Sequence, residues 1–179
     1  ITCGSWSEIW LNEGFATYLT GLYYERIRSA EFLDWKNGQI ESVTSQDGGS
    51  VIVNDTTSVS RIFDGRLSYS KAAMVLHMLR KYIGDNAFFS GIRSYLNDDA
   101  LKYAYSNTTQ LKLHFEQACN CDLNDFFQTW LYEEGFPIMD VSCIKTENGL
   151  VIKLNQKGSI NHNSPYKFTQ PIRLMGEGL

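Results

Sequence analysis

The sequence predicts a mainly α-helical protein whose C-terminal part turns to β structure. Before Pro137, apolar side chains recur at the three- and four-residue spacing of helices in six successive segments. After Pro137, apolar and polar residues alternate on both sides of an Asn148-Gly149 turn signal. We therefore expect a helical lobe over residues 1–137 and the first strands of a β-sandwich-like domain over residues 138–179.

The first helix is expected to run from a cap at Ser5 or Ser7 to about Arg28. It contains Gly14, although a glycine inside a helix costs about 1 kcal/mol relative to alanine. A helix tolerates this cost more readily where another backbone or an ion must come close. We therefore expect a close neighbour at Gly14.

Five further helices follow, joined by short turns apart from one long break. The break covers residues 46–64, and loops of this length inside a compact domain are usually functional or mobile. The helix expected directly after it is strongly amphipathic. The predicted helices cover residues 30–44, 67–83, 86–96, 108–118 and 122–134, and the predicted strands cover residues 139–143, 150–154 and 166–174.

The composition excludes several classes of function. The chain has 179 residues, 43% of them hydrophobic, which is enough for one core. Its formal net charge is −4, and its acidic and basic residues are scattered along the sequence. No basic face suits a nucleic acid, and no apolar run approaches the roughly 18 residues that cross a bilayer. We therefore expect neither a nucleic-acid partner nor a membrane segment in this chain.

The cysteines predict no structural site. The C-x-C spacing at residues 119–121 is too short for a usual zinc knuckle, and no C-x-x-C pair occurs among Cys3, Cys119, Cys121 and Cys143. We expect isolated, half-buried thiols, which leave the cellular compartment undetermined.

One carboxylate in the first helix is exceptional because helical spacing places it among apolar neighbours. Glu13 lies at i+4 from Ile9 and i+3 from Trp10. Burying an unpaired carboxylate costs on the order of several kcal/mol unless a cation or hydrogen-bond donors compensate. Two interpretations fit the residues: a distant Lys or Arg pairs with Glu13, or Glu13 is a metal ligand held on a rigid helix.

The surrounding residues favour the metal ligand. Aminopeptidase N-like gluzincins carry their third zinc ligand in the pattern W-x-(D/E)-x-W-L-N-E-G-F-A-x-Y, which resembles TCGSWSEIWLNEGFATYL at residues 2–19. The resemblance implies that Glu13 binds zinc together with two histidines of an H-E-x-x-H helix. In that family eighteen residues separate the second histidine from the glutamate, whereas twelve residues precede Glu13 here. The histidines and the general-base glutamate are therefore expected upstream of Ile1.

A second segment resembles the same family. Its Y-x-K-G-A-x-V-L-x-M-L motif is similar to RLSYSKAAMVLHML at residues 66–79. From composition alone, Tyr69 is one of ten tyrosines, for which packing with a wet hydroxyl is the ordinary role. By the resemblance, Tyr69 stabilises the oxyanion when zinc-bound water attacks the scissile carbonyl. Ala72 replaces the family glycine, a small-for-small change, and Lys71 is expected to be solvated or ion-paired.

Two residues close to the expected ligand are candidates for supporting roles. Glu8 matches an acidic position of the motif and could orient a site histidine, or it could favour the helix macrodipole as an N-terminal acid. Asn12 directly precedes the expected ligand and could also support it. No metal-ligand spacing occurs among the three histidines of the chain, His77, His114 and His162.

The resemblance implies the helical C-terminal lobe of a thermolysin-like catalytic domain, and hence part of a zinc metalloaminopeptidase. The expected cofactor is zinc, and the expected partners are peptide substrates with a free N-terminus. The chain alone is expected to be inactive, because catalytic zinc sites use three protein ligands. Two alternatives stay open: a pseudopeptidase without its ligands, and a helical protein-interaction module, against which the missing repeat period counts.

Overall fold

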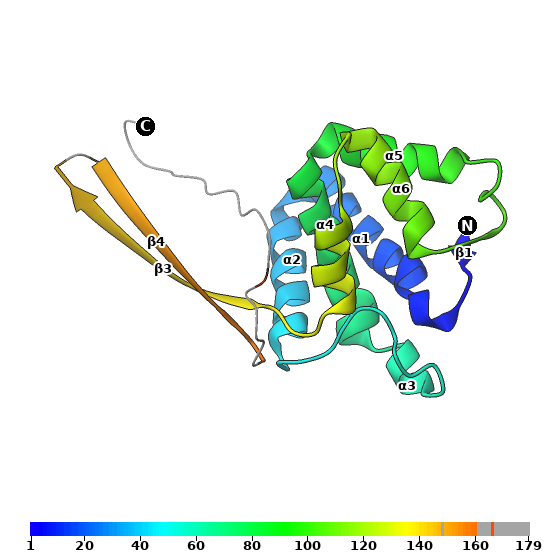
Figure 1. The fold of residues 1–179 in the computed structure, drawn as a ribbon, viewed down its shortest axis with the longest axis horizontal. Helices are drawn as coiled ribbons and strands as arrows, with labels where there is room; N and C mark the ends of the chain where they lie inside the picture. The colour runs from blue at the N-terminus through cyan, green and yellow to red at the C-terminus, as the bar shows by residue number, and fades with distance from the viewer. Residues whose placement is uncertain (148, 161–165, 167–179) are drawn as a thin grey trace.

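Helices make up most of the chain, and a β-hairpin projects from them (Figure 1). The structure is a computed structural model that describes residues 1–147, 149–160 and 166. The predicted mainly α fold is confirmed. Among the described residues, none of the helices combines the length and the apolar composition that crossing a bilayer requires.

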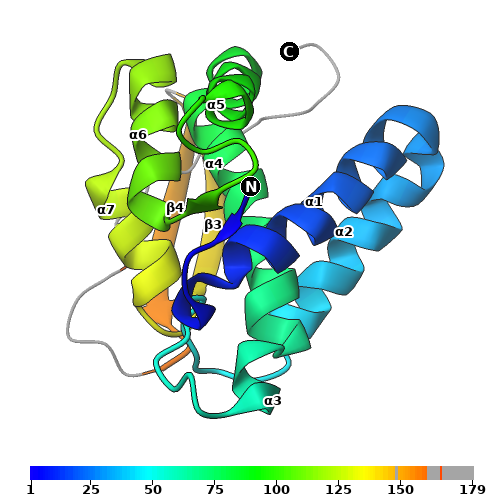
Figure 2. The ribbon, with the colours of Figure 1, turned by 90° about the vertical axis from the view of Figure 1, so that its right-hand side faces the viewer.

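The first two long helices form a pair along one side of the lobe (Figure 2). The chain begins with the short strand β1 (Thr2–Cys3) and the 3-10 turn η1 (Trp6–Glu8), and then enters α1 (Trp10–Ile27). Helix α2 (Ser29–Thr44) follows after a single residue. Both helices end where the sequence predicts, whereas α1 starts later than expected because the 3-10 turn occupies its predicted first turn.

The predicted break after α2 contains one short helix, α3 (Val59–Ile62). Part of this segment is built into the core, since Val51 and Val53 are 0% and 2% exposed. The Val51 N–H donates to the Leu131 carbonyl at 3.0 Å, and the Val53 N–H donates to the Ser7 carbonyl at 3.0 Å. The break therefore joins the start of the chain to its last helical segment.

A π-helical turn, η2 (Gly65–Lys71), leads directly into α4 (Ala72–Ile83). The prediction of one regular α-helix over residues 67–83 is therefore wrong for its first turn and confirmed for the remainder. The apolar face of α4 is the centre of the core, where Val75, Leu76 and Leu79 are at most 1% exposed.

The second half of the lobe packs α5 (Asp85–Asn97) against α6 (Thr108–Cys119). Between them, β2 (Tyr105–Ser106) pairs in parallel with β1 and so brings the start of the chain to this half. The predicted helix over residues 122–134 is divided into α7 (Asn124–Phe127) and a π-helical turn, η3 (Gln128–Tyr132).

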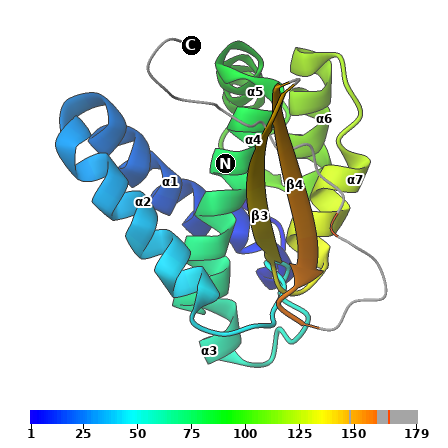
Figure 3. The same cartoon turned by 90° about the vertical axis from the view of Figure 1, so that its left-hand side faces the viewer.

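The hairpin consists of β3 (Pro137–Thr146) and β4 (Gly149–Gly158), which pair in antiparallel register. Figure 3 shows the molecule with the hairpin facing the viewer. The first two predicted strands are confirmed. Of the third, predicted over residues 166–174, only Tyr166 is described, and it lies outside any strand; the remainder falls outside the described residues.

One prediction about the cysteines is wrong. Cys119 and Cys121 form a disulfide instead of two isolated thiols. Cys3 is a half-buried free thiol and Cys143 an exposed one.

Candidate active site

A cleft of about 530 Å³ lies beside the first turns of α1, and Glu13 is one of its lining residues. The half-buried Glu13 shares this wall with Ile9 and Asn12, one turn or less away. Phe63 lines the cleft from the segment before η2. Of the two apolar neighbours predicted from helical spacing, Ile9 therefore lies in the cleft with Glu13.

The other predicted neighbour, Trp10, is directed away from the cleft. Its side chain is 0% exposed. The indole N–H donates to the Thr108 Oγ1 atom at 3.0 Å, across 98 residues of sequence. Trp10 thus joins α1 to the first turn of α6, and it fixes the rotation of α1 about its axis.

The ion pairs of the described residues do not include Glu13. Their acidic members are Glu25, Glu31, Asp85, Asp98, Asp99 and Glu116. The described part of the chain therefore supplies no cationic partner that would account for the position of the Glu13 carboxylate.

Tyr69 lies in the π-helical turn η2, close to Glu13. The turn is capped by Asp64, whose carboxylate accepts hydrogen bonds from the backbone N–H groups of Arg66 at 2.9 Å and Leu67 at 2.8 Å. Burial raises the pKa of the Tyr69 phenol, and the negative charge of Glu13 and a hydrogen bond to its carboxylate raise this pKa further. Tyr69 therefore stays protonated at neutral pH, as a hydrogen-bond donor must.

Gly14 explains how the two segments come so close. A Cβ atom added at Gly14 would lie 2.7 Å from the Cβ atom of Ala72, the first residue of α4. Only a residue without a side chain permits this approach of α1 to the junction between η2 and α4. The predicted close neighbour of Gly14 is thus the helix that follows Tyr69.

Lys71 fixes the same turn from its other side, which the sequence did not predict. The side chain is buried, and its Nζ atom donates to the Gly49 carbonyl at 2.8 Å. Burial and, to a smaller extent, the neighbouring charge of Arg66 lower the pKa of Lys71 to about 8. The expectation of a solvated lysine is wrong, because the long break folds back over η2 and covers this side chain.

Glu8 and Asn12 both hold backbone segments together at the edge of the cleft. The Glu8 Oε1 atom accepts from the Thr108 N–H at 2.8 Å, at the first turn of α6. The Asn12 Oδ1 atom accepts from the Cys3 N–H at 2.9 Å, and its Nδ2 atom donates to the Thr2 Oγ1 atom at 2.9 Å. Glu8 thus interacts with the N-terminus of a distant helix, an interaction that favours an acid there.

Comparison with known proteins assigns the chain to a family. The model of the peptidase family M1 domain matches residues 1–130, which contain both Glu13 and Tyr69. The chain belongs to peptidase family M1. The M1 chain is 32% identical over 173 residues to aminopeptidase N of Oryctolagus cuniculus, and this match covers 84% of the chain and 17% of the relative. It is 31% identical over 150 residues to aminopeptidase M1-C of Oryza sativa subsp. japonica, and this match covers 79% of the chain and 16% of the relative.

A solved structure has the same fold. Legionella pneumophila aminopeptidase A, determined in complex with aspartic acid, matches 87% of the M1 chain with a TM-score of 0.72 at 19% sequence identity. The match covers 18% of that protein. The M1 chain spans about a fifth of the length of the curated relatives it matches.

The two described histidines of the M1 chain, His77 and His114, do not line the cleft. The His77 ring packs between Tyr18 and Phe32, with centroids 6.2 and 6.0 Å away. His114 interacts with Ser94 and Asp98. In the part of the chain that the structure describes, no group of three or more His, Cys, Asp or Glu side chains could hold a metal ion; His162 lies outside that part.

Proposed function

We propose that this chain is part of a zinc metalloaminopeptidase, which removes N-terminal residues from peptides by attack of zinc-activated water. The observation that carries the proposal is the meeting of Glu13 and Tyr69. The two residues are 56 positions apart in the sequence, yet the phenol interacts with the Glu13 carboxylate, which lines the cleft. Membership of peptidase family M1 supports it, as do relatives named as aminopeptidases.

The chemistry of Glu13 fits a zinc site. A carboxylate oxygen is a usual zinc ligand, and this one lines an accessible cleft without an ion-pair partner among the described residues. Glu13 would hold the cation together with two histidines of an H-E-x-x-H segment from outside these residues, as the resemblance implies. When bound, zinc supplies a Lewis acid and a water whose pKa is lowered to about 7.

Tyr69 supplies the second function of the site. Its protonated phenol would donate a hydrogen bond to the carbonyl oxygen of the scissile peptide bond as negative charge develops there. Such a donor is worth roughly 10²–10³ in rate, by comparison with other oxyanion holes. The Asp64 cap and the Lys71 hydrogen bond hold η2 on both sides, so the phenol is positioned before a substrate binds.

Glu8 and Asn12 would support the site through the backbone. Asn12 fixes β1 against α1, and Glu8 fixes the first turn of α6 beside η1. We also propose that Glu8 orients one of the zinc-binding histidines. The division into a helical catalytic lobe over residues 1–137 and the start of a β domain over 138–179 is likewise proposed.

With one of three ligands, the isolated chain should bind zinc weakly and be inactive. We expect the purified chain to contain much less than one zinc per molecule and to hydrolyse no aminoacyl anilide. Metal analysis that found zinc bound one-to-one by these 179 residues would contradict this.

The proposal is tested first in the gene. An H-E-x-x-H motif whose second histidine is encoded nineteen positions before Glu13 would support an active peptidase, whereas a gene without that motif would favour a pseudopeptidase. In the full gene product, Tyr69→Phe should lower kcat by roughly 10²–10³ with a much smaller change in KM. An unchanged kcat would remove Tyr69 from the mechanism.

A further inference from the structure

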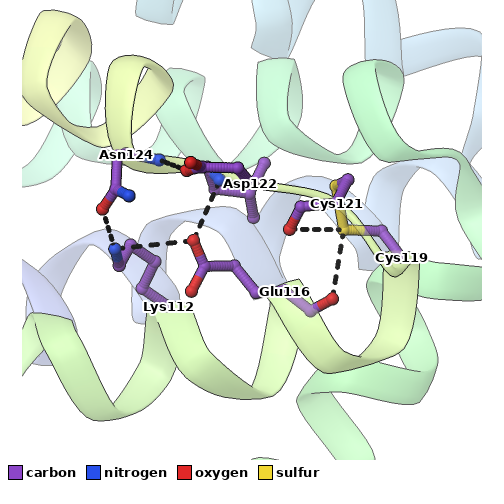
Figure 4. Close-up of a disulfide and its surroundings, with 7 residues drawn as sticks. Lys112, Glu116, Cys119, Cys121, Asp122 and Asn124 are labelled. Atoms are coloured by element: carbon purple, nitrogen blue, oxygen red, sulfur yellow. Dashed lines mark hydrogen bonds and ion pairs between the residues drawn. A yellow bond between two sulfur atoms is a disulfide. The ribbon is translucent and has the colours of Figure 1, made fainter.

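A disulfide closes the turn between α6 and α7 (Figure 4). It joins Cys119, the last residue of α6, to Cys121, two positions later, with Cα atoms 5.2 Å apart. Cys121 is exposed and Cys119 is half-buried. A loop of three residues removes little entropy from the unfolded chain, because this effect grows with loop length. The disulfide therefore stabilises the fold only weakly. Stability alone does not explain why a disulfide with one exposed cysteine is present here.

Backbone hydrogen bonds hold this turn independently of the sulfur bond. Asn120 adopts the left-handed conformation of a helix C-cap, with φ of 51°. The Cys121 N–H donates to the Glu116 carbonyl at 3.3 Å, and the Leu123 N–H donates to the Glu116 Oε1 atom at 2.9 Å. Leu123 is 0% exposed. The turn therefore has the contacts to keep its shape when the sulfur bond is broken.

The same geometry accommodates the reduced form. The Cys119 Sγ atom lies 3.6 Å from the Glu116 carbonyl oxygen and 3.7 Å from the Cys121 carbonyl oxygen. A disulfide sulfur carries no hydrogen, so in the oxidised form these distances are contacts only. A thiol is a weak hydrogen-bond donor, so the Cys119 thiol would find an acceptor without any movement of the backbone. After the bond breaks, the two sulfurs move apart by side-chain rotation, so both oxidation states fit one backbone conformation.

We propose that Cys119 and Cys121 form a reversible thiol–disulfide exchange site whose reactants are low-molecular-weight thiols. The thiolate of the reagent attacks the exposed Cys121 sulfur, a new bond forms between these two sulfurs, and the Cys119–Cys121 bond breaks. Cys119 leaves as a thiolate and takes a proton from water. A second reagent thiolate attacks the reagent sulfur of the mixed disulfide, which releases the Cys121 thiolate. Two reagent thiols are thereby oxidised to one disulfide as the pair is reduced to two thiols.

The remaining cysteines provide an internal comparison. Cys143 is an exposed free thiol on β3 and Cys3 a half-buried one near the start of the chain. Neither is disulfide-bonded, so each would stop at a mixed disulfide with the reagent. Cys119 and Cys121 differ because the neighbouring thiol displaces the reagent and restores the intramolecular bond.

The test uses the whole chain with Cys3→Ser and Cys143→Ser, so that only the pair can react. The protein is equilibrated in buffers of reduced and oxidised glutathione, quenched by alkylation and analysed by mass spectrometry. We expect one two-electron transition between disulfide and dithiol, little mixed disulfide, and the same far-ultraviolet circular dichroism in both states. Adding Cys119→Ser, which removes the thiol that displaces the reagent, should stop the reaction at a stable glutathione adduct on the exposed Cys121.

Three results would overturn the proposal. The first is a pair that dithiothreitol does not reduce without denaturant. The second is a dithiol that oxidised glutathione does not convert back to the intramolecular disulfide. The third is a loss of helical signal on reduction, for which the double variant Cys119→Ser/Cys121→Ser is the matched control without either thiol. The outcome is independent of the peptidase proposal, because no step involves the cleft.

Discussion

Replacing Gly14 by alanine should force α1 and α4 apart. The added Cβ atom would lie 2.7 Å from the Ala72 Cβ atom and 3.4 Å from the Ala72 carbonyl carbon. Both methyl groups are attached directly to helical backbone and cannot rotate away, so a helix must shift. Overpacking costs about 1–3 kcal/mol, and a contact this rigid belongs at the upper end. Since alanine regains about 1 kcal/mol of helix propensity, we expect Gly14→Ala to lower the free energy of unfolding by about 2 kcal/mol.

The assay is urea denaturation followed by circular dichroism, with two matched variants. Gly38→Ala lies on α2, where an added Cβ atom meets nothing within 4 Å, so it should raise the free energy of unfolding by about 1 kcal/mol. Ala72→Gly should reverse the loss in the Gly14→Ala background, because it removes the methyl group that clashes.

Equal stability of Gly14→Ala and Gly38→Ala would refute the reasoning. Failure of Ala72→Gly to restore stability would refute it as well. Either result would mean that α1 does not approach α4 as closely as the structure has it, and the juxtaposition of Glu13 with Tyr69 would lose its cause.

Three further predictions concern the surroundings of the cleft and the α6–α7 turn. Because the pKa of Lys71 falls from 10.5 to about 8 on folding, the unfolded chain binds more protons than the folded chain between these pH values. The free energy of unfolding should therefore rise with pH across this window by up to about 3 kcal/mol relative to Lys71→Met. A constant difference between the two proteins in urea denaturation would contradict it. Asn12→Ala should cost about 1–2 kcal/mol and speed amide exchange at Cys3, because two hydrogen bonds are lost; unchanged exchange would speak against it. The double variant Cys119→Ser/Cys121→Ser should lose less than about 2 kcal/mol, because the closed loop is short, and a loss of 4 kcal/mol in thermal denaturation would be too large.

Local sequence patterns predicted those helix ends, apolar faces and strands that are set by residues close together in the sequence. The ends of α1 and α2, the apolar face of α4 and the strands of the hairpin follow from periodicity and turn residues. The close neighbour of Gly14 was also predictable, since a glycine that remains inside a long helix requires a steric reason. Its partner, Ala72, was not, because no local rule connects two helices.

The differences arise where distant segments meet. Lys71 is buried because the Gly49 carbonyl reaches it from the long break, and its π-helical turn is fixed by that contact and by the Asp64 cap. Trp10 lies away from the cleft because Thr108, nearly a hundred residues later, offers a hydrogen-bond acceptor. For Cys119 and Cys121, the left-handed Asn120 between them brings the two sulfurs together, and a spacing of two residues gives no sign of it.

The most direct measurement is the zinc affinity of the full gene product, determined at buffered free-zinc concentrations. The account predicts one zinc per polypeptide for the unchanged protein and for Glu41→Ala, a matched loss of an exposed carboxylate on α2. It predicts a loss of at least tenfold to a hundredfold in affinity for Glu13→Ala, because a direct ligand should matter no less than the outer contacts that cost this much. Retention of one zinc by Glu13→Ala with an unchanged dissociation constant would contradict the central claim that this carboxylate holds the metal.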